Sequence, residues 1–236
     1  MSGQLWVVEG GDGVGKSTQA RELVTRLNES KLLGDKTAHY WHFPNYQAKP
    51  WGETVTQYLK GRFGSVNEVS PYFAAILYSA DQGQSASEIQ SILNSGDWII
   101  ADRYYPSNLA HQSAKLDDKT ERDKFLAWLI QLNYHLGIVE PNGIIYLNLP
   151  AEISLKRMQS RREAAQAQLF KTKDQVNQID IHEQDDRYAT RVLEEYNHLA
   201  DKFKWNMVLC AEGNKQLTAK HIAQKVWEIV SPKLKG

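Results

Sequence analysis

The sequence predicts an α/β fold in which a five-stranded parallel sheet is covered by helices on both faces. Short apolar runs alternate with longer helical patterns along the 236 residues, as they do in βαβ units. The apolar runs are nearly continuous, which is typical of strands that are covered on both faces. The length suits one α/β domain with a substantial core. We therefore expect a three-layer αβα sandwich.

Five apolar runs have the length and composition of buried strands. They are short and rich in Val, Ile and aromatic residues, which favour the extended backbone. We predict strands at 5–9, 38–43, 98–101, 144–149 and 205–210.

The segments between these runs have helical patterns. We predict helices at 16–29, 50–60, 71–95, 119–138, 151–168, 183–203 and 215–230. Pro50 and Pro71 suit first helical positions, and Gly61, Gly96 and Gly137 stand where helices would end.

One stretch of the chain, 157–186, is unusually polar and rich in Gln, Lys and Arg. It has no clear apolar stripe, so it suits either a solvated helix or a mobile lid over a phosphate site. We expect one domain over residues 1–236, with a candidate lid near 157–186.

Composition excludes several classes of protein. Lys plus Arg and Asp plus Glu both total 28, and the absence of a basic run argues against nucleic acid or an anionic membrane as the main partner. The single cysteine, Cys210, excludes an intramolecular disulfide and lies in an apolar run that suits a buried strand. No apolar stretch reaches the roughly 18 residues of a membrane span, and no signal peptide is recognisable. The expected location is the cytoplasm.

The clearest motif is a phosphate-binding loop at residues 10–17. The pattern G-x-x-x-x-G-K-S follows a predicted strand and precedes an amphipathic helix, as a P-loop requires. Its glycines let backbone N–H groups turn toward phosphate oxygens at a helix N-terminus. Lys16 would reach the β and γ phosphates of ATP, and the Ser17 hydroxyl would ligate Mg²⁺. The predicted cofactor-binding residues are Gly10, Gly13, Gly15, Lys16, Ser17 and Thr18.

The third predicted strand indicates the type of phosphate chemistry. It is followed directly by Asp102, which suits a carboxylate that holds the Mg²⁺ shell. Hydrolytic ATPases commonly have a water-activating Glu next, whereas Arg103 stands here. A guanidinium favours the binding of a second phosphate. Transfer to a phosphorylated acceptor is therefore a better prediction than hydrolysis.

Three segments together resemble one known family, the thymidylate kinases. They are the loop at 10–19, Phe43-Pro44, and the run Asp102-Arg103-Tyr104-Tyr105-Pro106-Ser107-Asn108-Leu109-Ala110-His111-Gln112. The resemblance covers nearly the whole chain. It implies a five-stranded parallel sheet, a homodimer, and transfer of the γ-phosphoryl group of MgATP to thymidine monophosphate (dTMP).

The resemblance also implies roles for individual residues. Asp12 would contact the sugar 3′-hydroxyl and the phosphate shell, and Arg103 would bind the acceptor phosphate. Tyr78 would stack on the base, Asn108 would bind the pyrimidine edge, and His111 would favour deoxyribose through its bulk near C2′. An ordinary packing role is the alternative for His111. The predicted substrate-binding residues are Asp12, Phe43, Lys49, Tyr78, Gln82, Arg103, Ser107, Asn108, His111 and Glu183.

Lid arginines complete the implied catalytic set. Gly13 stands where one branch of the family has an arginine, and in members that lack it basic lid residues stabilise the transition state. Arg157, Arg161 and Arg162 are the candidates here, with a solvated helix face as the alternative. The predicted catalytic residues are Lys16, Asp12, Arg103, Arg161 and Arg162.

Two positions depart from the family pattern. Asn45 follows Phe43-Pro44 where an arginine usually clamps the acceptor phosphate, and Gln82 stands where an arginine usually reaches O4 of thymine. Either Lys49 compensates, or the acceptor is a modified pyrimidine nucleotide or another nucleoside monophosphate. Phe43-Pro44 enters the expected acceptor pocket and is a candidate for a cis peptide bond.

Two other classes of function remain as alternatives. A nucleoside kinase needs a carboxylate to accept the 5′-hydroxyl proton, and the first carboxylate after the second strand is Glu53. A nucleotide-binding sensor with a decayed acceptor site would explain the two absent arginines.

Overall fold

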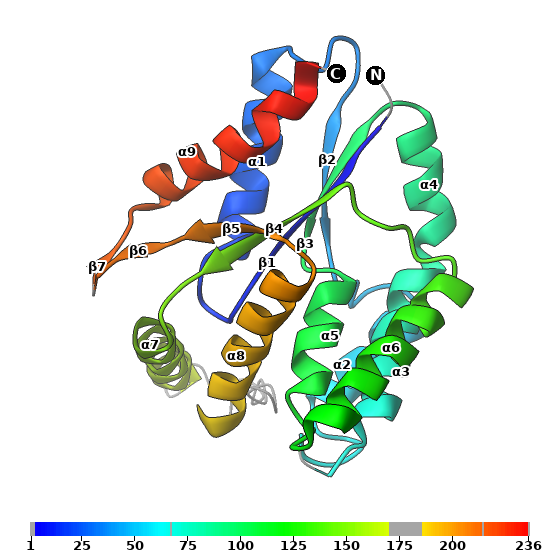
Figure 1. The fold of residues 1–236 in the computed structure, drawn as a ribbon, viewed down its shortest axis with the longest axis vertical. Helices are drawn as coiled ribbons and strands as arrows, with labels where there is room; N and C mark the ends of the chain where they lie inside the picture. The colour runs from blue at the N-terminus through cyan, green and yellow to red at the C-terminus, as the bar shows by residue number, and fades with distance from the viewer. Residues whose placement is uncertain (1–2, 67, 170–185, 214, 236) are drawn as a thin grey trace.

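The sheet of the computed structural model has the predicted five parallel strands. The structure describes residues 3–66, 68–169, 186–213 and 215–235. The strands lie in the order β2-β3-β1-β4-β5 and all neighbouring pairs are parallel (Figure 1). Their bounds are β1 Leu5–Gly10, β2 Ala38–His42, β3 Trp98–Asp102, β4 Gly143–Asn148 and β5 Asn206–Leu209.

Helices cover both faces of this sheet and complete the predicted three layers. Figure 1 shows α1 and α9 on one face, and α4, α5, α6 and α8 on the other. The helices are α1 Lys16–Ser30, α2 Trp51–Leu59, α3 Pro71–Gln84, α4 Ala86–Asn94, α5 Tyr105–Ser113, α6 Lys119–His135, α7 Ala151–Leu169, α8 Asp186–Lys202 and α9 Ala219–Val230. A 3₁₀ turn at Ser231–Lys235 and a small antiparallel hairpin, β6 Ala211–Glu212 with β7 Lys215–Gln216, complete the described elements.

The central strand β1 explains why the apolar runs are continuous in sequence. All six of its residues are buried, and successive side chains point to opposite faces. Trp6 and Val8 belong to the core cluster that includes residues of α1 and α9, whereas Leu5 and Val7 belong to a cluster on the other face with residues of α4. Both faces of the strand therefore need apolar side chains.

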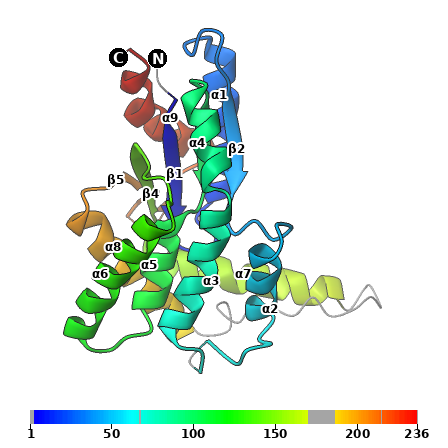
Figure 2. The ribbon, with the colours of Figure 1, turned by 90° about the vertical axis from the view of Figure 1, so that its right-hand side faces the viewer.

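The predicted helix at 71–95 is wrong as a single element. It consists of α3 and α4, which are separated at Ser85 and lie one beyond the other in Figure 2. Gly83 and Ser85 are both poorer helix formers than Ala, so this is the weakest point of the segment. The sequence prediction also missed α5, a helix of nine residues, and the β6–β7 hairpin, whose two strands have two residues each.

The predicted lid is only partly within the described chain. Residues 151–169 form α7, which reaches away from the sheet in Figure 2, and α8 begins at Asp186. Arg161 and Arg162 lie on α7, but their side chains and all of Glu183 are outside the described part of the structure. None of the described helices combines the length and apolar character that crossing a bilayer requires.

Candidate active site

The candidate site lies where β1 and β3 end side by side at the centre of the sheet. Val8 of β1 pairs with Asp102 of β3, so the loop after β1 and the turn after β3 leave the same edge. The loop enters α1 through Gly15, whose φ of 107° is open to glycine and strained for other residues. Gly13 has a φ of 80° for the same reason. These backbone requirements explain the glycines of the motif.

Lys16, the first residue of α1, is buried against this loop. Its Nζ donates to the carbonyl oxygens of Gly10 at 2.9 Å and Gly11 at 2.8 Å, and lies 3.7 Å from Oδ1 of Asp12. Burial lowers the pKa of Lys16 to about 8, and the positive charge of Arg103 acts in the same direction. The buried ammonium group is thus held by two neutral carbonyl oxygens and lies near the Asp12 carboxylate, and phosphate oxygens would be stronger partners than the carbonyls.

Asp102 ends β3 and is fully buried. Its Oδ2 accepts hydrogen bonds from Tyr40 Oη at 2.9 Å and His42 Nδ1 at 3.0 Å, whereas its Oδ1 has no hydrogen-bond partner within the described chain. Burial raises the pKa of this carboxyl, but hydrogen bonds from His42 and Ser17 and the charges of His42 and Lys16 outweigh it and hold the pKa at about 2. Asp102 is therefore ionised at neutral pH, with one oxygen available.

This carboxylate and the Ser17 hydroxyl fit a Mg²⁺ ion. Mg²⁺ prefers oxygen ligands and is usually bound by one or two protein groups together with substrate phosphates and water. The described residues contain no cluster of three or more His, Cys, Asp or Glu side chains that could hold a metal ion.

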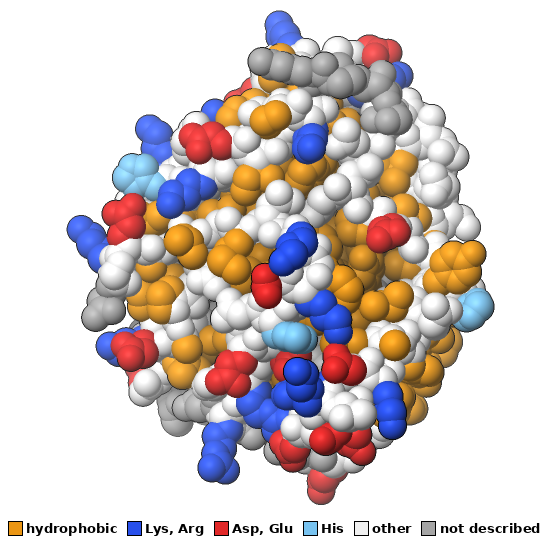
Figure 3. All heavy atoms as spheres, in the orientation of Figure 1, with side chains coloured by type: hydrophobic (Ala, Val, Ile, Leu, Met, Phe, Trp, Pro, Cys, Tyr) orange, Lys and Arg blue, Asp and Glu red, His pale blue; other side chains and the backbone are white. Residues whose placement is uncertain are grey.

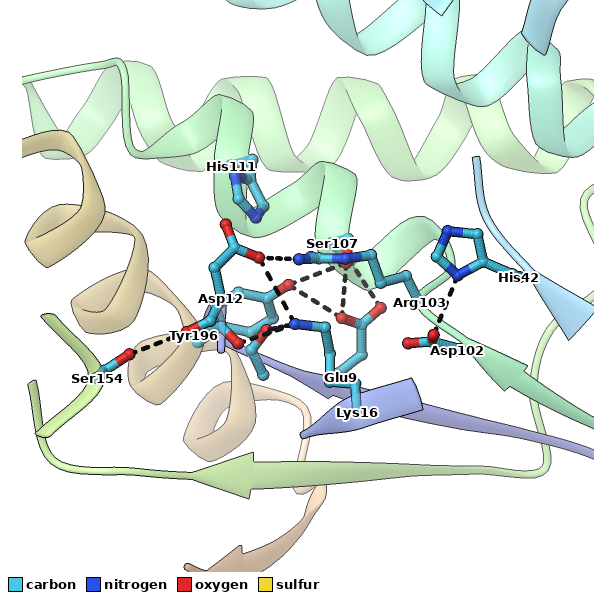
Figure 4. A network of polar contacts seen from close by, with 12 residues as sticks. Glu9, Asp12, Lys16, His42, Asp102, Arg103, Ser107, His111, Ser154 and Tyr196 are labelled. Atoms are coloured by element: carbon cyan, nitrogen blue, oxygen red, sulfur yellow. Dashed lines mark hydrogen bonds and ion pairs between the residues drawn. The ribbon is translucent and has the colours of Figure 1, made fainter. Parts of the chain in front are cut away.

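Arg103 lies between the loop and α5. Its guanidinium pairs with the carboxylate of Asp12, and its Nη1 donates to Ser107 Oγ at 3.2 Å (Figure 4). The residue has a φ of 67°, and its backbone N–H donates to the carbonyl oxygen of Val8 at 3.1 Å, so the turn after β3 is fixed to β1. Burial would lower the pKa of Arg103, but Asp12 and the other nearby carboxylates raise it. Arg103 therefore keeps its positive charge, and its contacts with Asp12 and Ser107 fix the position of the guanidinium.

Glu9 fixes the turn between β3 and α5 through hydrogen bonds, and the sequence analysis assigned it no role. Its buried carboxylate accepts hydrogen bonds from the backbone N–H groups of Tyr104 at 2.9 Å and Ser107 at 3.0 Å. It also accepts from Ser107 Oγ at 2.7 Å and Tyr196 Oη at 2.9 Å. Burial raises the pKa of Glu9, whereas Arg103 and these donors oppose the shift. The sequence feature that could have indicated this role is an acidic residue at the end of an otherwise apolar strand.

A cavity of about 200 Å³ opens beside Arg103. It brings together eight of the ten predicted substrate-binding residues, and Gln112, which was not predicted, also lines it. The eight are Asp12, Phe43, Tyr78, Gln82, Arg103, Ser107, Asn108 and His111.

The structure does not bring Lys49 into this cavity. Its side chain is 80% exposed and its Nζ lies 3.7 Å from Oε2 of Glu53, its neighbour one helical turn away. Nothing in the described structure therefore supports Lys49 as a substitute for the absent arginine. The Phe43-Pro44 bond is cis, as predicted, and the Phe43 ring packs on Tyr104 at 5.1 Å between centroids.

His111 makes one contribution to the pH dependence of stability. Burial and the charges of Arg103 and Lys16 lower its pKa to about 3, against the partial compensation of Asp12. A histidine in the unfolded chain titrates near pH 6.5, so the unfolded state binds more protons between about pH 6.5 and pH 3. The folded state therefore loses stability as the pH falls below about 6.5.

A His111→Tyr variant should lack this contribution. We expect the difference in unfolding free energy between the variant and the parent to shift by up to about 2 kcal/mol in favour of the variant from pH 7 to pH 5. Urea denaturation across this range measures it. Parallel curves for the two proteins would show that His111 does not titrate in this way.

The fold and the site together define a class of protein. A parallel sheet, a glycine loop with a buried lysine, and an adjoining polar cavity with a fixed arginine are the parts of a P-loop phosphotransferase with room for an acceptor. The chain belongs to the thymidylate kinase family: the family model described as Thymidylate kinase matches residues 8–222. It is therefore a kinase, as the sequence analysis predicted.

Individual relatives agree with this assignment. A thymidylate kinase of Prochlorococcus marinus is 29% identical over 227 residues, which cover 96% of this chain and 93% of the relative. A thymidylate kinase of Synechococcus sp. (strain WH7803) is 32% identical over 167 residues, or 69% of this chain and 74% of the relative. The solved thymidylate kinase of Candida albicans has the same fold, with a TM-score of 0.69 and 23% identity over 98% of this chain and 92% of that one.

Proposed function

We propose that this enzyme transfers the γ-phosphoryl group of MgATP to dTMP and forms dTDP and ADP. The observation that carries the proposal is the shared wall between the two sites. Asp12 belongs to the phosphate loop and also lines the cavity, where it pairs with Arg103. A donor phosphate on the loop and an acceptor phosphate at Arg103 would therefore be neighbours.

On the donor side, the loop residues Gly10, Gly13, Gly15 and Thr18 would surround the ATP phosphates with backbone N–H groups, and Lys16 would bind the β and γ phosphates. Ser17 and the available oxygen of Asp102 would hold Mg²⁺, which would neutralise phosphate charge during transfer.

On the acceptor side, the fixed guanidinium group of Arg103 would bind the phosphate of dTMP through two N–H donors. This phosphate is already an anionic nucleophile at neutral pH, so no general base is needed, and positioning together with charge neutralisation carries the rate. Asp12 would keep Arg103 and the sugar in place. Lid arginines of α7, Arg161 and Arg162, are proposed to complete the charge neutralisation.

The rest of the cavity suits a deoxynucleoside. Tyr78, supported edge-on by Tyr58 with 6.1 Å between ring centroids, is proposed to stack on the base. Phe43 would shape the entrance, Ser107 would hold Arg103 in place, and His111 would lie against the sugar. Asn108, Gln82 and Gln112 would meet the polar edge of the base.

We also propose a cytoplasmic homodimer built on a single domain. Three neighbouring side chains of α3, Tyr72, Phe73 and Ile76, are 40–44% exposed, which supports an interface on that side. Acidic and basic side chains are interspersed on the face in Figure 3, which does not suggest a nucleic-acid surface there. A monomeric mass by light scattering would contradict the dimer.

The decisive test is ADP release with MgATP and either dTMP, thymidine or no acceptor. We expect stimulation by dTMP alone. Turnover on thymidine would favour a nucleoside kinase, and tight MgATP binding without turnover on any acceptor would favour a sensor.

Removal of Mg²⁺ should abolish this activity. Because Mg²⁺ would neutralise phosphate charge during transfer, chelation with EDTA is expected to lower the rate at least about 100-fold, and added Mg²⁺ should restore it. Coupled ADP release measures both steps. A rate that survives chelation would contradict the proposed metal site.

A further inference from the structure

The acceptor cavity is lined by three buried amide side chains with unused hydrogen-bonding groups. Gln82 and Asn108 are 2% exposed and Gln112 is 0% exposed. Within the described chain, the fully buried amide atoms of this set that have no partner are Oε1 of Gln82, Oδ1 of Asn108, and both Oε1 and Nε2 of Gln112. Buried polar groups are normally paired, so this set indicates which groups a ligand must bring.

The orientation of Asn108 is fixed by its neighbours. Its Nδ2 donates to the carbonyl oxygen of Ala75 at 2.9 Å and to Ser79 Oγ at 3.2 Å, and Ser79 in turn donates to Asn133 Oδ1 at 2.7 Å. The carbonyl oxygen of Asn108 must therefore remain the unused end. Gln112 offers one carbonyl oxygen and one NH2 group with two N–H donors, whichever way its amide is turned.

The arginine of this cavity is already paired within the protein. Among the described residues that line the cavity, Arg103 is the one Lys or Arg, and it is held by Asp12 and Ser107. His111 is neutral at pH 7 because its pKa is lowered to about 3. Among their buried unpartnered atoms, the amides thus present three acceptor oxygens and one nitrogen, Nε2 of Gln112, which carries two N–H donors.

This balance suits one class of pyrimidine better than another. The pairing edge of a 4-oxopyrimidine such as thymine has a single donor, N3–H, and two acceptors. A 4-aminopyrimidine such as cytosine has an amino group with two N–H donors, and its ring N3 can accept from Gln112 Nε2. An amino group beside carbonyl oxygens satisfies acceptors that thymine would leave unpaired.

We propose that the acceptor site also takes a 4-aminopyrimidine deoxynucleotide, so that the enzyme phosphorylates dCMP. This inference rests on the proposed function, because it names a second substrate of the same site. The chemistry is unchanged: a phosphate oxygen of dCMP forms a bond to the γ-phosphorus of ATP, and the bond to the departing ADP oxygen breaks. The products are dCDP and ADP.

The matched substrates for the test are dCMP and dUMP, which share an unmethylated C5 and differ in their 4-amino or 4-oxo edge. We expect kcat/KM of the full chain for dCMP to be above that for dUMP or within about tenfold of it, whereas a pocket built for a 4-oxo group would reject the amine by about 10⁴-fold. A dCMP value more than about tenfold below that of dUMP would overturn the inference.

Activity on dTMP is measured in parallel, so that the two proposals can fail separately. If dTMP is phosphorylated and dCMP is not, this inference alone fails. If no acceptor is phosphorylated, the proposed function fails. The inference is then tested separately by calorimetry, and a Kd for dCMP more than about tenfold weaker than that for dUMP would overturn it.

Variants connect the preference to the amides. Gln112→Glu replaces a mixed group with an acceptor, so we expect the dCMP to dUMP ratio of kcat/KM to rise about tenfold. Gln82→Glu should act in the same direction and serves if the first variant does not fold. Gln90→Glu, on the exposed side of α4 and bonded to Asn94, is the matched control and should leave the ratio unchanged. An unchanged ratio in the folded cavity variants would overturn the assignment.

Discussion

Replacement of Lys16 with alanine is expected to lower kcat/KM for phosphoryl transfer by about 10³-fold or more. Lys16 is the buried cation at the start of α1, and its Nζ is held 2.8–2.9 Å from two carbonyl oxygens of the loop. Alanine removes the charge that would bind the β and γ phosphates. Because the loop carbonyls can be hydrated, we expect the fold to survive. Coupled ADP release with saturating dTMP measures the rate, and circular dichroism the fold.

The matched control for this prediction is Lys124→Ala. Lys124 is an exposed lysine of α6 that does not line the acceptor cavity, so its loss should leave kcat/KM unchanged. If a folded Lys16→Ala protein kept more than about a tenth of the parent activity, the assignment of the loop as the donor site would be wrong.

Replacement of Arg103 with glycine is expected to lower kcat/KM for dTMP by about 10³-fold. Glycine is chosen because Arg103 has a φ of 67°, which glycine adopts without strain, so that loss of the guanidinium is the main change. The acceptor phosphate would lose the guanidinium group that binds it, and Asp12 would lose its ion-pair partner. Steady-state kinetics with varied dTMP measure the loss.

Lys204→Gly is the control for this second prediction. Lys204 also has a positive φ, 54°, and its side chain is 81% exposed and pairs with Asp201 on the surface. The change removes a cation from a comparable backbone conformation and should leave kcat/KM as it was. A similar loss in both variants would assign the effect of Arg103→Gly to general disturbance of the fold.

The sheet could be predicted from sequence because its signal is local. Each strand is an apolar run covered on both faces, and β1 was predicted at 5–9 and found at Leu5–Gly10. The phosphate loop is local too, since its glycines and Lys16 meet over a few residues. The break at Ser85 and the short helix α5 were missed because neither has a long periodic pattern.

The parts of the site that the sequence analysis missed depend on contacts between distant residues. Tyr196 donates to Glu9 from 187 positions away, and no local pattern pairs them. Tyr40 and His42 reach Asp102 from a neighbouring strand, about 60 residues earlier in the chain. Most acceptor residues were identified through family resemblance, whereas Lys49 was named only as the cation nearest to the absent arginine, and it lies outside the cavity. The side chain of Lys49 points to Glu53 and solvent. Its direction depends on the packing of the loop and could not be predicted from a local pattern.

The central claim is that the phosphate loop and the cavity beside Arg103 form one site with a donor and an acceptor phosphate. The most direct measurement follows the γ-phosphoryl group of labelled ATP in the presence of Mg²⁺ and dTMP. The account predicts that the label moves into dTDP, one dTDP for each ADP, and that this transfer is lost in Arg103→Gly. Label that appears only as inorganic phosphate, at a rate unchanged by dTMP, would contradict it.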